Sequence, residues 1–301
     1  MADIFTVANK EFSDMIKSRR FIILIVIFGL IMTIAMATIY IRVVQTMPNI
    51  PGVHMPRGFL GMMAFMLTGT LSNFAPVMGL ALGCDAISGE REKGTLKIVL
   101  AQPVFRDTII NGKFLAATLA VSLAILITSL ISIGASTLII GVTPTAEETM
   151  RMALFLLFSI LFTMTYYGIA VFLSTIMKKT SHSVILSVTI WALFTFVIPI
   201  IASLIAITIA PPTIGPREQA TQESIKRFTS IVETITSITP NYHYNKIGQY
   251  ILSPYSTTQP QERSTIMNSL TYAAPNIIVL AIITALAFIA SYITFTRQEV
   301  K

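Results

Sequence analysis

The segment Ser183–Ala210 reads SVILSVTIWALFTFVIPIIASLIAITIA and contains no Asp, Glu, Lys, Arg or His. It exceeds the ~20 apolar residues that a helix needs to cross a bilayer core about 30 Å thick. Because the segment is continuously apolar and does not alternate with polar residues, it indicates a helix and not a barrel strand. The sequence therefore predicts that this segment is a transmembrane span.

Five other runs are also long, apolar and free of charged residues. They are Phe21–Ile41, Phe59–Cys84, Phe114–Ile140, Met152–Met177 and Ala273–Thr296. Hydrophobic residues make up 54% of the chain and charged residues only 12%, whereas soluble domains carry about 25% charged residues. We therefore expect an all-α integral membrane protein with six transmembrane helices, in which residues 1–301 form a single transmembrane domain.

Lys and Arg concentrate in the connections on one side of the predicted spans. Arg19 and Arg20 precede span one, Arg91 and Lys93 follow span two, and Lys178 follows span four. By the positive-inside rule, both termini are cytoplasmic in a multi-pass protein of the cell membrane. The net charge of +7 then fits contact with anionic membrane lipid, and we expect no nucleic-acid partner.

Two segments outside the spans carry apolar stripes at helical spacing. Residues 1–20 are predicted to form an interfacial amphipathic helix, with a stripe of Ile4, Ala8, Phe12, Met15 and Ile16. Residues 211–272 are predicted to form an external loop that contains a helix, with a stripe of Ile225, Phe228, Val232 and Ile235. The stretch that begins at Pro240 is expected to break that helix.

The connection between spans two and three is short and charged. Its central cluster is Ser88, Gly89, Glu90, Arg91, Glu92, Lys93, Gly94 and Thr95. Ser88 can cap a short helix, while Gly94 and Pro103 mark its limits. Such an element can dock on a cytoplasmic partner, or it can be a solvated loop that merely obeys the positive-inside rule.

Gly89 and Gly94 have the spacing of a phosphate-binding Walker A loop, and Thr95 follows them. The lysine that should directly follow the second glycine is missing, and no buried strand precedes the loop. We therefore expect no ATP site in this chain.

The stretch SGEREKGTLKIVLAQPVFRDTIINGKF, residues 88–114, closely resembles the cytoplasmic signature of type-2 ABC transporter permeases. The charged cluster, Gly94, Pro103 and the Gly112-Lys113 pair occur in that family's order. The layout of the whole chain also resembles these permeases, which have six spans, an interfacial N-terminal helix and a larger external loop before the last span.

The resemblance implies a transmembrane subunit, without ATPase activity or cofactor of its own, of an ATP-driven exporter. It places Glu90, Arg91 and Glu92 on or beside a coupling helix that contacts the nucleotide-binding subunit. It also implies two permease copies, expected to be identical, and two ATPase copies that bind ATP and Mg²⁺. The resemblance does not identify the substrate.

Other function classes fit the residues less well. The six runs contain no ionisable group of the kind that ion-driven pumps use within the membrane, so the driving energy must come from elsewhere. An intramembrane enzyme would need a catalytic base at membrane depth, and none is present there. An ATPase-independent channel or facilitator is compatible with uncharged spans but gives the Glu90 cluster no role.

Candidate residues of a translocation path are Asn73 and Pro76 in span two and Pro199 in span five. Asn73 can instead form an interhelical hydrogen bond, and both prolines can simply kink their helices. Soft-metal ligands in the external regions are Met47, His54, Met55 and His243. Their spacing matches no metal motif, so we expect no metal site.

Overall fold

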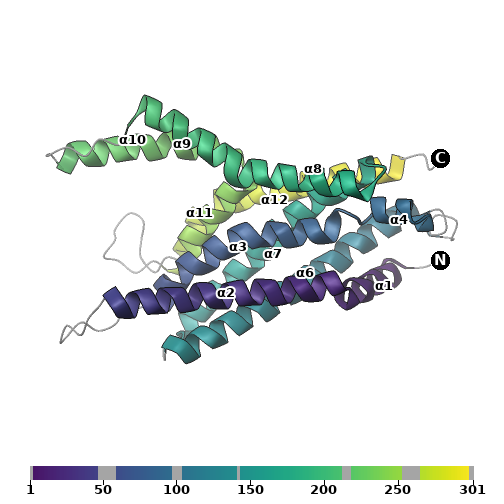
Figure 1. Ribbon diagram of the computed structural model, residues 1–301, viewed down its shortest axis with the longest axis horizontal. Helices are drawn as coiled ribbons and strands as arrows, with labels where there is room; N and C mark the ends of the chain where they lie inside the picture. The colour runs from purple at the N-terminus through teal and green to yellow at the C-terminus, as the bar shows by residue number, and fades with distance from the viewer. Residues whose placement is uncertain are drawn as a thin grey trace.

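The computed structural model describes residues 3–46, 59–96, 104–140, 143–211, 218–252 and 265–297. Throughout these ranges the chain is helical and forms no β-strand, as predicted. The elements, shown in Figure 1, are α1 (Ile4–Lys17), α2 (Arg19–Thr46), α3 (Phe59–Gly83), α4 (Ser88–Glu92), α6 (Arg106–Ile140), α7 (Ala146–Ile176), α8 (Thr180–Ala192), the π-helical turn η1 (Leu193–Val197), α9 (Ile198–Ile209), α10 (Glu218–Thr236), α11 (Pro240–Leu252) and α12 (Ile266–Arg297).

The long helices form an elongated bundle. Within the described residues, five helices are long and apolar enough to cross a membrane, and six if α1 and α2 count as one span. The α1–α2 pair is bent by 60° at the break between the two helices. Figure 1 shows α1, α4 and the end of α12 together at one end of the bundle, which an even number of spans requires.

Three spans begin more than one helical turn before their apolar runs. Helix α6 starts at Arg106, α7 at Ala146 and α12 at Ile266. Hydrophobicity marks only the part of a helix inside the bilayer, whereas capping decides where the helix begins. At the start of α7, Glu148 N–H donates to Thr145 Oγ1 at 3.3 Å, and Thr145 N–H donates to Glu148 Oε2 at 2.8 Å.

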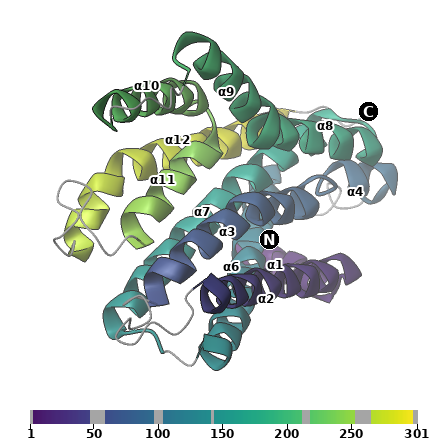
Figure 2. The ribbon, with the colours of Figure 1, turned by 60° about the vertical axis from the view of Figure 1, so that its left-hand side comes forward.

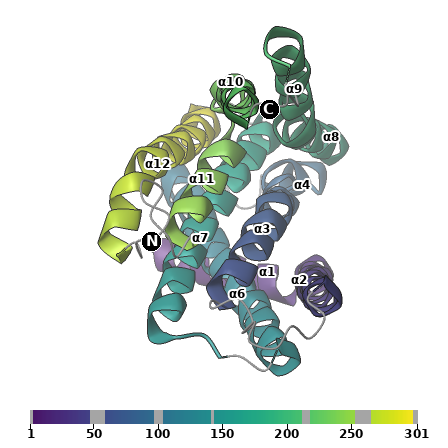
Figure 3. The same ribbon diagram turned by 90° about the vertical axis from the view of Figure 1, so that its left-hand side faces the viewer.

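Helix α7 is the central span, and it packs mainly on α3 and α12 (Figure 3). Gly79 and Gly83 lie four residues apart on α3. A Cβ at Gly79 would clash with the carbonyl oxygen of Thr163, and one at Gly83 would lie 2.8 Å from the carbonyl oxygen of Tyr167. This small-xxx-small arrangement lets two backbones touch, which is how apolar helices associate inside a membrane.

The described part of the predicted external loop contains α10, α11 and the first turns of α12, and α11 belongs to the core. Helix α10 is amphipathic as predicted, and it ends before Pro240, which begins α11. Helix α11 packs against α3, α7 and α12 (Figure 2). Its Tyr244 is fully buried, stacks on Phe162 at 4.2 Å and shares a 2.8 Å hydrogen bond with Ser159.

The fifth span lies at the edge of the bundle. Its apolar window from α8 to α9 is only 11% buried, compared with 67% for α7. The turn η1 lies just before Pro199, which stands in the first turn of α9. Proline lacks an N–H group and crowds the preceding turn, and a π-helical turn is one way to accommodate it. In α3, by contrast, the α-helix continues through Pro76.

We predict that Gly79→Ala destabilises the protein by about 1–3 kcal/mol, because the new methyl group overpacks a backbone contact. The control is Gly69→Ala on the same helix, where a Cβ meets nothing within 4 Å. Alanine there should be neutral or slightly stabilising, since it favours helix more than glycine does. The midpoint of thermal unfolding in detergent measures both effects, and equal midpoints for the two variants would contradict the close α3–α7 packing.

Candidate functional site

The start of α4 is fixed by buried hydroxyl groups. The backbone N–H groups of Ile87 and Ser88 donate to Ser174 Oγ on α7 at 3.1 and 2.9 Å. Ser88 Oγ donates to the carbonyl oxygen of Cys84 at 3.1 Å. The predicted capping role of Ser88 is wrong, because Ile87 occupies the N-cap position and Ser88 is already inside the helix.

Arg91 and Glu92 join α4 to the junction of α7 and α8. The Arg91 guanidinium donates to the carbonyl oxygens of Thr175 at 3.0 Å and Met177 at 2.6 Å, at the end of α7. Glu92 accepts a 3.2 Å hydrogen bond from the backbone N–H of Thr180, the first residue of α8. A cation at a helix C-terminus and an anion at an N-terminus both complement the helix dipole. These two side chains therefore hold α4 on the ends of two spans.

Glu90 joins α4 to α6 and α1 through a buried lysine. Lys113 Nζ lies 2.6 Å from Glu90 Oε1 and 2.8 Å from Glu11 Oε2, and only 3% of its side chain is exposed. The other oxygen, Glu90 Oε2, is buried and has no hydrogen-bond partner among the described residues. A buried charge is costly unless it is paired, so these three groups depend on one another.

The apolar stripe of α1 packs on α6. Ala8 is buried, and a Cβ at Gly112 would lie 2.6 Å from a methyl carbon of Val7. Burial raises the pKa of Glu11, but the charge and hydrogen bond of Lys113 and the hydrogen bond of Lys10 lower it further, to below its ordinary value. Glu11 is therefore ionised at neutral pH. That α1 also lies in the membrane interface stays a prediction.

The exposed part of the charged cluster is its C-terminal tip, Glu92 to Thr95, at the end of the bundle (Figure 1). Gly94 has a φ of +73°, which favours glycine. Thr95 Oγ1 donates to the carbonyl oxygen of Glu90 at 3.2 Å. Gly89 is half-buried, and a Cβ there would lie 3.3 Å from Asp85 Cβ. Of the predicted coupling residues, only this tip is fully open to a partner, while Pro103 lies outside the described residues.

A second candidate site is a polar cavity of about 430 Å³ between α3, η1, α9, α10 and α11. It is lined by Asn73 and Pro199, whereas Pro76 is buried in the bundle and does not line it. Asn73 Nδ2 donates to the carbonyl oxygen of Gly69 on its own helix at 2.8 Å. The interhelical hydrogen bond expected as an alternative for Asn73 is not among those of the described residues.

Helix α11 supplies cavity residues that the sequence did not single out. Asn241 accepts a hydrogen bond from Tyr166 Oη, and its Nδ2 lies 3.3 Å from Thr195 Oγ1. Lys246 Nζ forms a 2.7 Å ion pair with Glu233 of α10. The signal was available, because α11 begins with a proline and its Tyr244, Ile247, Ile251 and Leu252 recur at helical spacing.

His243, considered above as a metal ligand, is held by protein groups. Its Nδ1 lies 2.9 Å from Asn276 Oδ1, and its Nε2 lies 2.8 Å from the carbonyl oxygen of Ser237. Asn276 is an amide inside the predicted span six that the sequence analysis did not use. The other candidate ligands, Met47, His54 and Met55, lie outside the described residues.

The burial of two cations was not predicted, because each directly precedes a predicted span and was expected at its end. Lys113 precedes Phe114 in span three, and Arg151 precedes Met152 in span four. Arg151 is only 1% exposed, and its guanidinium donates to Ile251 O and to Ser269 Oγ, both at 2.9 Å. Arg151 thus connects α7 to the end of α11 and to α12, as Lys113 connects α6 to α1 and α4.

We predict that Lys113→Met lowers stability by about 3–5 kcal/mol, because two carboxylates lose their buried partner. Lys93→Met is the control, since Lys93 is exposed on the tip of the same charged cluster. The control should stay close to the wild type in thermal unfolding. A Lys113→Met protein with an unchanged midpoint would show that the ion bridge contributes nothing to stability.

Sequence comparisons agree with this geometry. A family model described as ABC-2 family transporter protein matches residues 5–300. The chain is 27% identical over 215 residues to the probable ABC transporter permease protein NosY of Pseudomonas aeruginosa, an alignment that covers 69% of this chain and 72% of that protein. It is 26% identical over 210 residues to the protein of the same name from Stutzerimonas stutzeri, covering 67% and 70%. The chain therefore belongs to the ABC-2 family and is a multi-pass transmembrane permease subunit of an ABC transporter.

Proposed function

We propose that this permease couples ATP hydrolysis by a separate nucleotide-binding subunit to export, and that the tip of α4 is its docking point. The observation that carries the proposal is that the tip is exposed while the rest of α4 is tied to four other helices. Glu90 and Arg91 are half-buried and bond to α6 and α7, Glu92 is exposed but bonds to the start of α8, and Lys93 to Thr95 are exposed. Glu90 and Glu92 then serve to transmit force, and the exposed residues serve to bind the partner.

The contacts of α4 give a route for that force. Glu90 reaches α6 and α1 through Lys113, Arg91 reaches the end of α7, and Glu92 reaches the start of α8. A displacement of α4 therefore acts on several spans at once. Packed helices respond to such a displacement as rigid bodies that move between discrete arrangements, which is what alternating access requires.

The charges near the docking point suit a protein partner. A cavity of about 470 Å³ between α1 and α4 is lined by Lys10, Asp14, Arg19, Arg20 and Lys93. Arg20 pairs with Asp85 at the end of α3. Patches of mixed charge favour a specific orientation and fast association of a complementary surface. ATP and Mg²⁺ are then bound by the partner subunit, and this chain needs no cofactor.

The polar cavity beside Asn73 is our candidate for part of the translocation path. Glu233 and Lys246 neutralise one another there, while Asn73 and Asn245 offer amide groups. A π-helical turn lines the same cavity, and such turns often occur at functional sites. The fifth span borders this cavity and its apolar window is only 11% buried, so we place the second copy of the permease, in a homodimer, along it.

The docking proposal predicts that the double variant Lys93→Glu with Thr95→Glu no longer copurifies with a nucleotide-binding subunit from native membranes in mild detergent. The matched control is Lys226→Glu with Thr229→Glu, two exposed positions on α10, which should keep the partner. Both preparations are analysed by mass spectrometry after affinity purification. Full retention of the partner by the tip variant would contradict docking at α4. Recovery of wild-type permease alone would favour an ATPase-independent channel or facilitator.

The translocation proposal predicts that a cysteine at position 73 changes its reactivity during the ATP cycle. Asn73→Cys is made in a Cys84→Ala background and treated with a membrane-impermeant maleimide, with and without ATP and vanadate. Labelling should differ between the two states, because the cavity opens and closes. Met267→Cys, which is 72% exposed at the start of α12 and does not line this cavity, should react equally in both. Equal labelling at position 73 would remove Asn73 from the path.

A further inference from the structure

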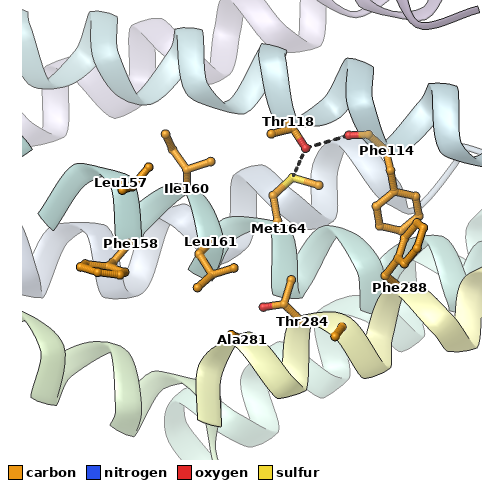
Figure 4. Close-up of a pocket in the computed structure, with 11 residues that line it drawn as sticks. Phe114, Thr118, Leu157, Phe158, Ile160, Leu161, Met164, Ala281, Thr284 and Phe288 are labelled. Carbon is orange, nitrogen blue, oxygen red and sulfur yellow. Dashed lines mark hydrogen bonds between the residues drawn. The ribbon is translucent and has the colours of Figure 1, made fainter. Parts of the chain in front are cut away.

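A second, apolar cavity lies on the side of the bundle between α6, α7 and α12. Its volume is about 600 Å³, within the range of small-molecule sites. Figure 4 shows Phe114 and Phe288 close together at one end and Leu157 and Phe158 toward the other. The two phenylalanine rings meet edge to face at 4.6 Å. They close the groove toward the α4 end, so a ligand must enter it sideways, from the surrounding membrane.

The polar side chains among the described residues that line the groove already make hydrogen bonds within the protein. Thr118 Oγ1 donates to the carbonyl oxygen of Phe114 at 2.8 Å and contacts Met164 Sδ at 3.7 Å (Figure 4). Thr284 Oγ1 bonds the carbonyl oxygen of Leu280 at 2.8 Å and Thr165 Oγ1 at 2.7 Å. With both hydroxyl groups satisfied within the protein, water would find no partners there and an apolar chain would lose none.

The charges near the groove and its depth in the bilayer indicate which kind of apolar chain would bind there. At the α4 end of α6 and α12, Arg106 donates to the carbonyl oxygen of Thr296 at 3.4 Å, and Arg297 is exposed. Phe114 lies eight residues above Arg106 on α6, or about 12 Å along the helix. One leaflet contributes roughly 15 Å of hydrocarbon, with several ångströms of headgroup outside it. A headgroup beside the two arginines would therefore put the distal half of its acyl chain at the level of the groove.

We propose that this groove is a binding site for one acyl chain of an anionic phospholipid whose headgroup lies against Arg106 and Arg297. Leu157 and Ile160 on α7 and the small side chains of Ala281 and Ala285 on α12 line the site. The acyl chain fills the space between α6 and α12 on the far side of the Phe114–Phe288 contact, where only α7 lies between the two helices. The site is independent of the docking and translocation proposals and requires only that the bundle lie in a membrane.

The site is tested by measuring the phospholipid that remains on the full chain after purification in mild detergent, by native mass spectrometry. Ala281→Trp fills the groove, and Ile282→Trp places the same side chain on the neighbouring position, which is 52% exposed to the surrounding lipid. We expect the wild type and Ile282→Trp to retain an anionic phospholipid and Ala281→Trp to lose it. Equal retention by both tryptophan variants, or retention of a sterol or isoprenoid in place of a phospholipid, would overturn the proposal.

A second measurement uses the wild-type chain and so does not depend on the folding of any variant. Phosphatidylglycerol with a photoreactive group in the distal half of one chain is added to nanodiscs of phosphatidylcholine that contain the protein. Cross-links should concentrate on the groove peptides of α6, α7 and α12, and Arg106→Gln with Arg297→Gln should reduce them. Cross-links of the same density on α9, or an equal yield with photoreactive phosphatidylcholine, would show ordinary boundary lipid and refute a specific site.

Discussion

Lys113 lies almost fully buried between Glu90 of α4 and Glu11 of α1. An unpaired ammonium group at this depth would be strongly unfavourable, so both carboxylates must stay in place for α6 to pack as it does. The requirement ties three segments that are distant in the chain into one unit at the α4 end of the bundle. Arg91 and Glu92 extend that unit to α7 and α8 through backbone groups at helix ends. The polar contacts at this end thus hold the helices together, which hydrophobic burial cannot do between helices surrounded by lipid.

The middle of the bundle depends on close backbone approach instead. Gly79 and Gly83 let α3 contact α7, and Gly168 of α7 lets α12 approach, since a Cβ there would lie 3.0 Å from Ala287 Cβ. Around these contacts, hydroxyl groups bond mainly to carbonyl oxygens of their own helices, and a few cross between helices, as Ser159 does to Tyr244. The central helix α7 is therefore rigidly surrounded, while α8 and α9 contact few neighbours.

Much of the fold could be predicted from the types of residue in the sequence. The six apolar runs, the helical N-terminal stripe, the helix in residues 218–236 and the glycine at position 94 all follow from periodicity and backbone preference. The predicted capping role of Ser88 was wrong. A hydroxyl group near the start of a helix can accept from a free N–H group ahead of it or donate to a carbonyl oxygen before it, and the sequence does not say which. The burial of α11 was missed because its polar residues suggest a surface, and only its neighbours show that Asn241 and Tyr244 have partners inside the bundle.

The sequence by itself determined that the chain spans a membrane with helices, because no other arrangement satisfies the backbone of long uncharged segments in hydrocarbon. Its charged cluster and the residues that follow it were enough to indicate the transporter family. Only the tertiary structure decided which charges of that cluster bond to other helices, since the partners of Glu90, Arg91 and Glu92 lie 23 to 88 residues away along the chain. Ion pairs and grooves between spans depend on how helices are rotated against each other, and that rotation is set by contacts such as that of Gly112 with Val7 on α1, which no local pattern encodes.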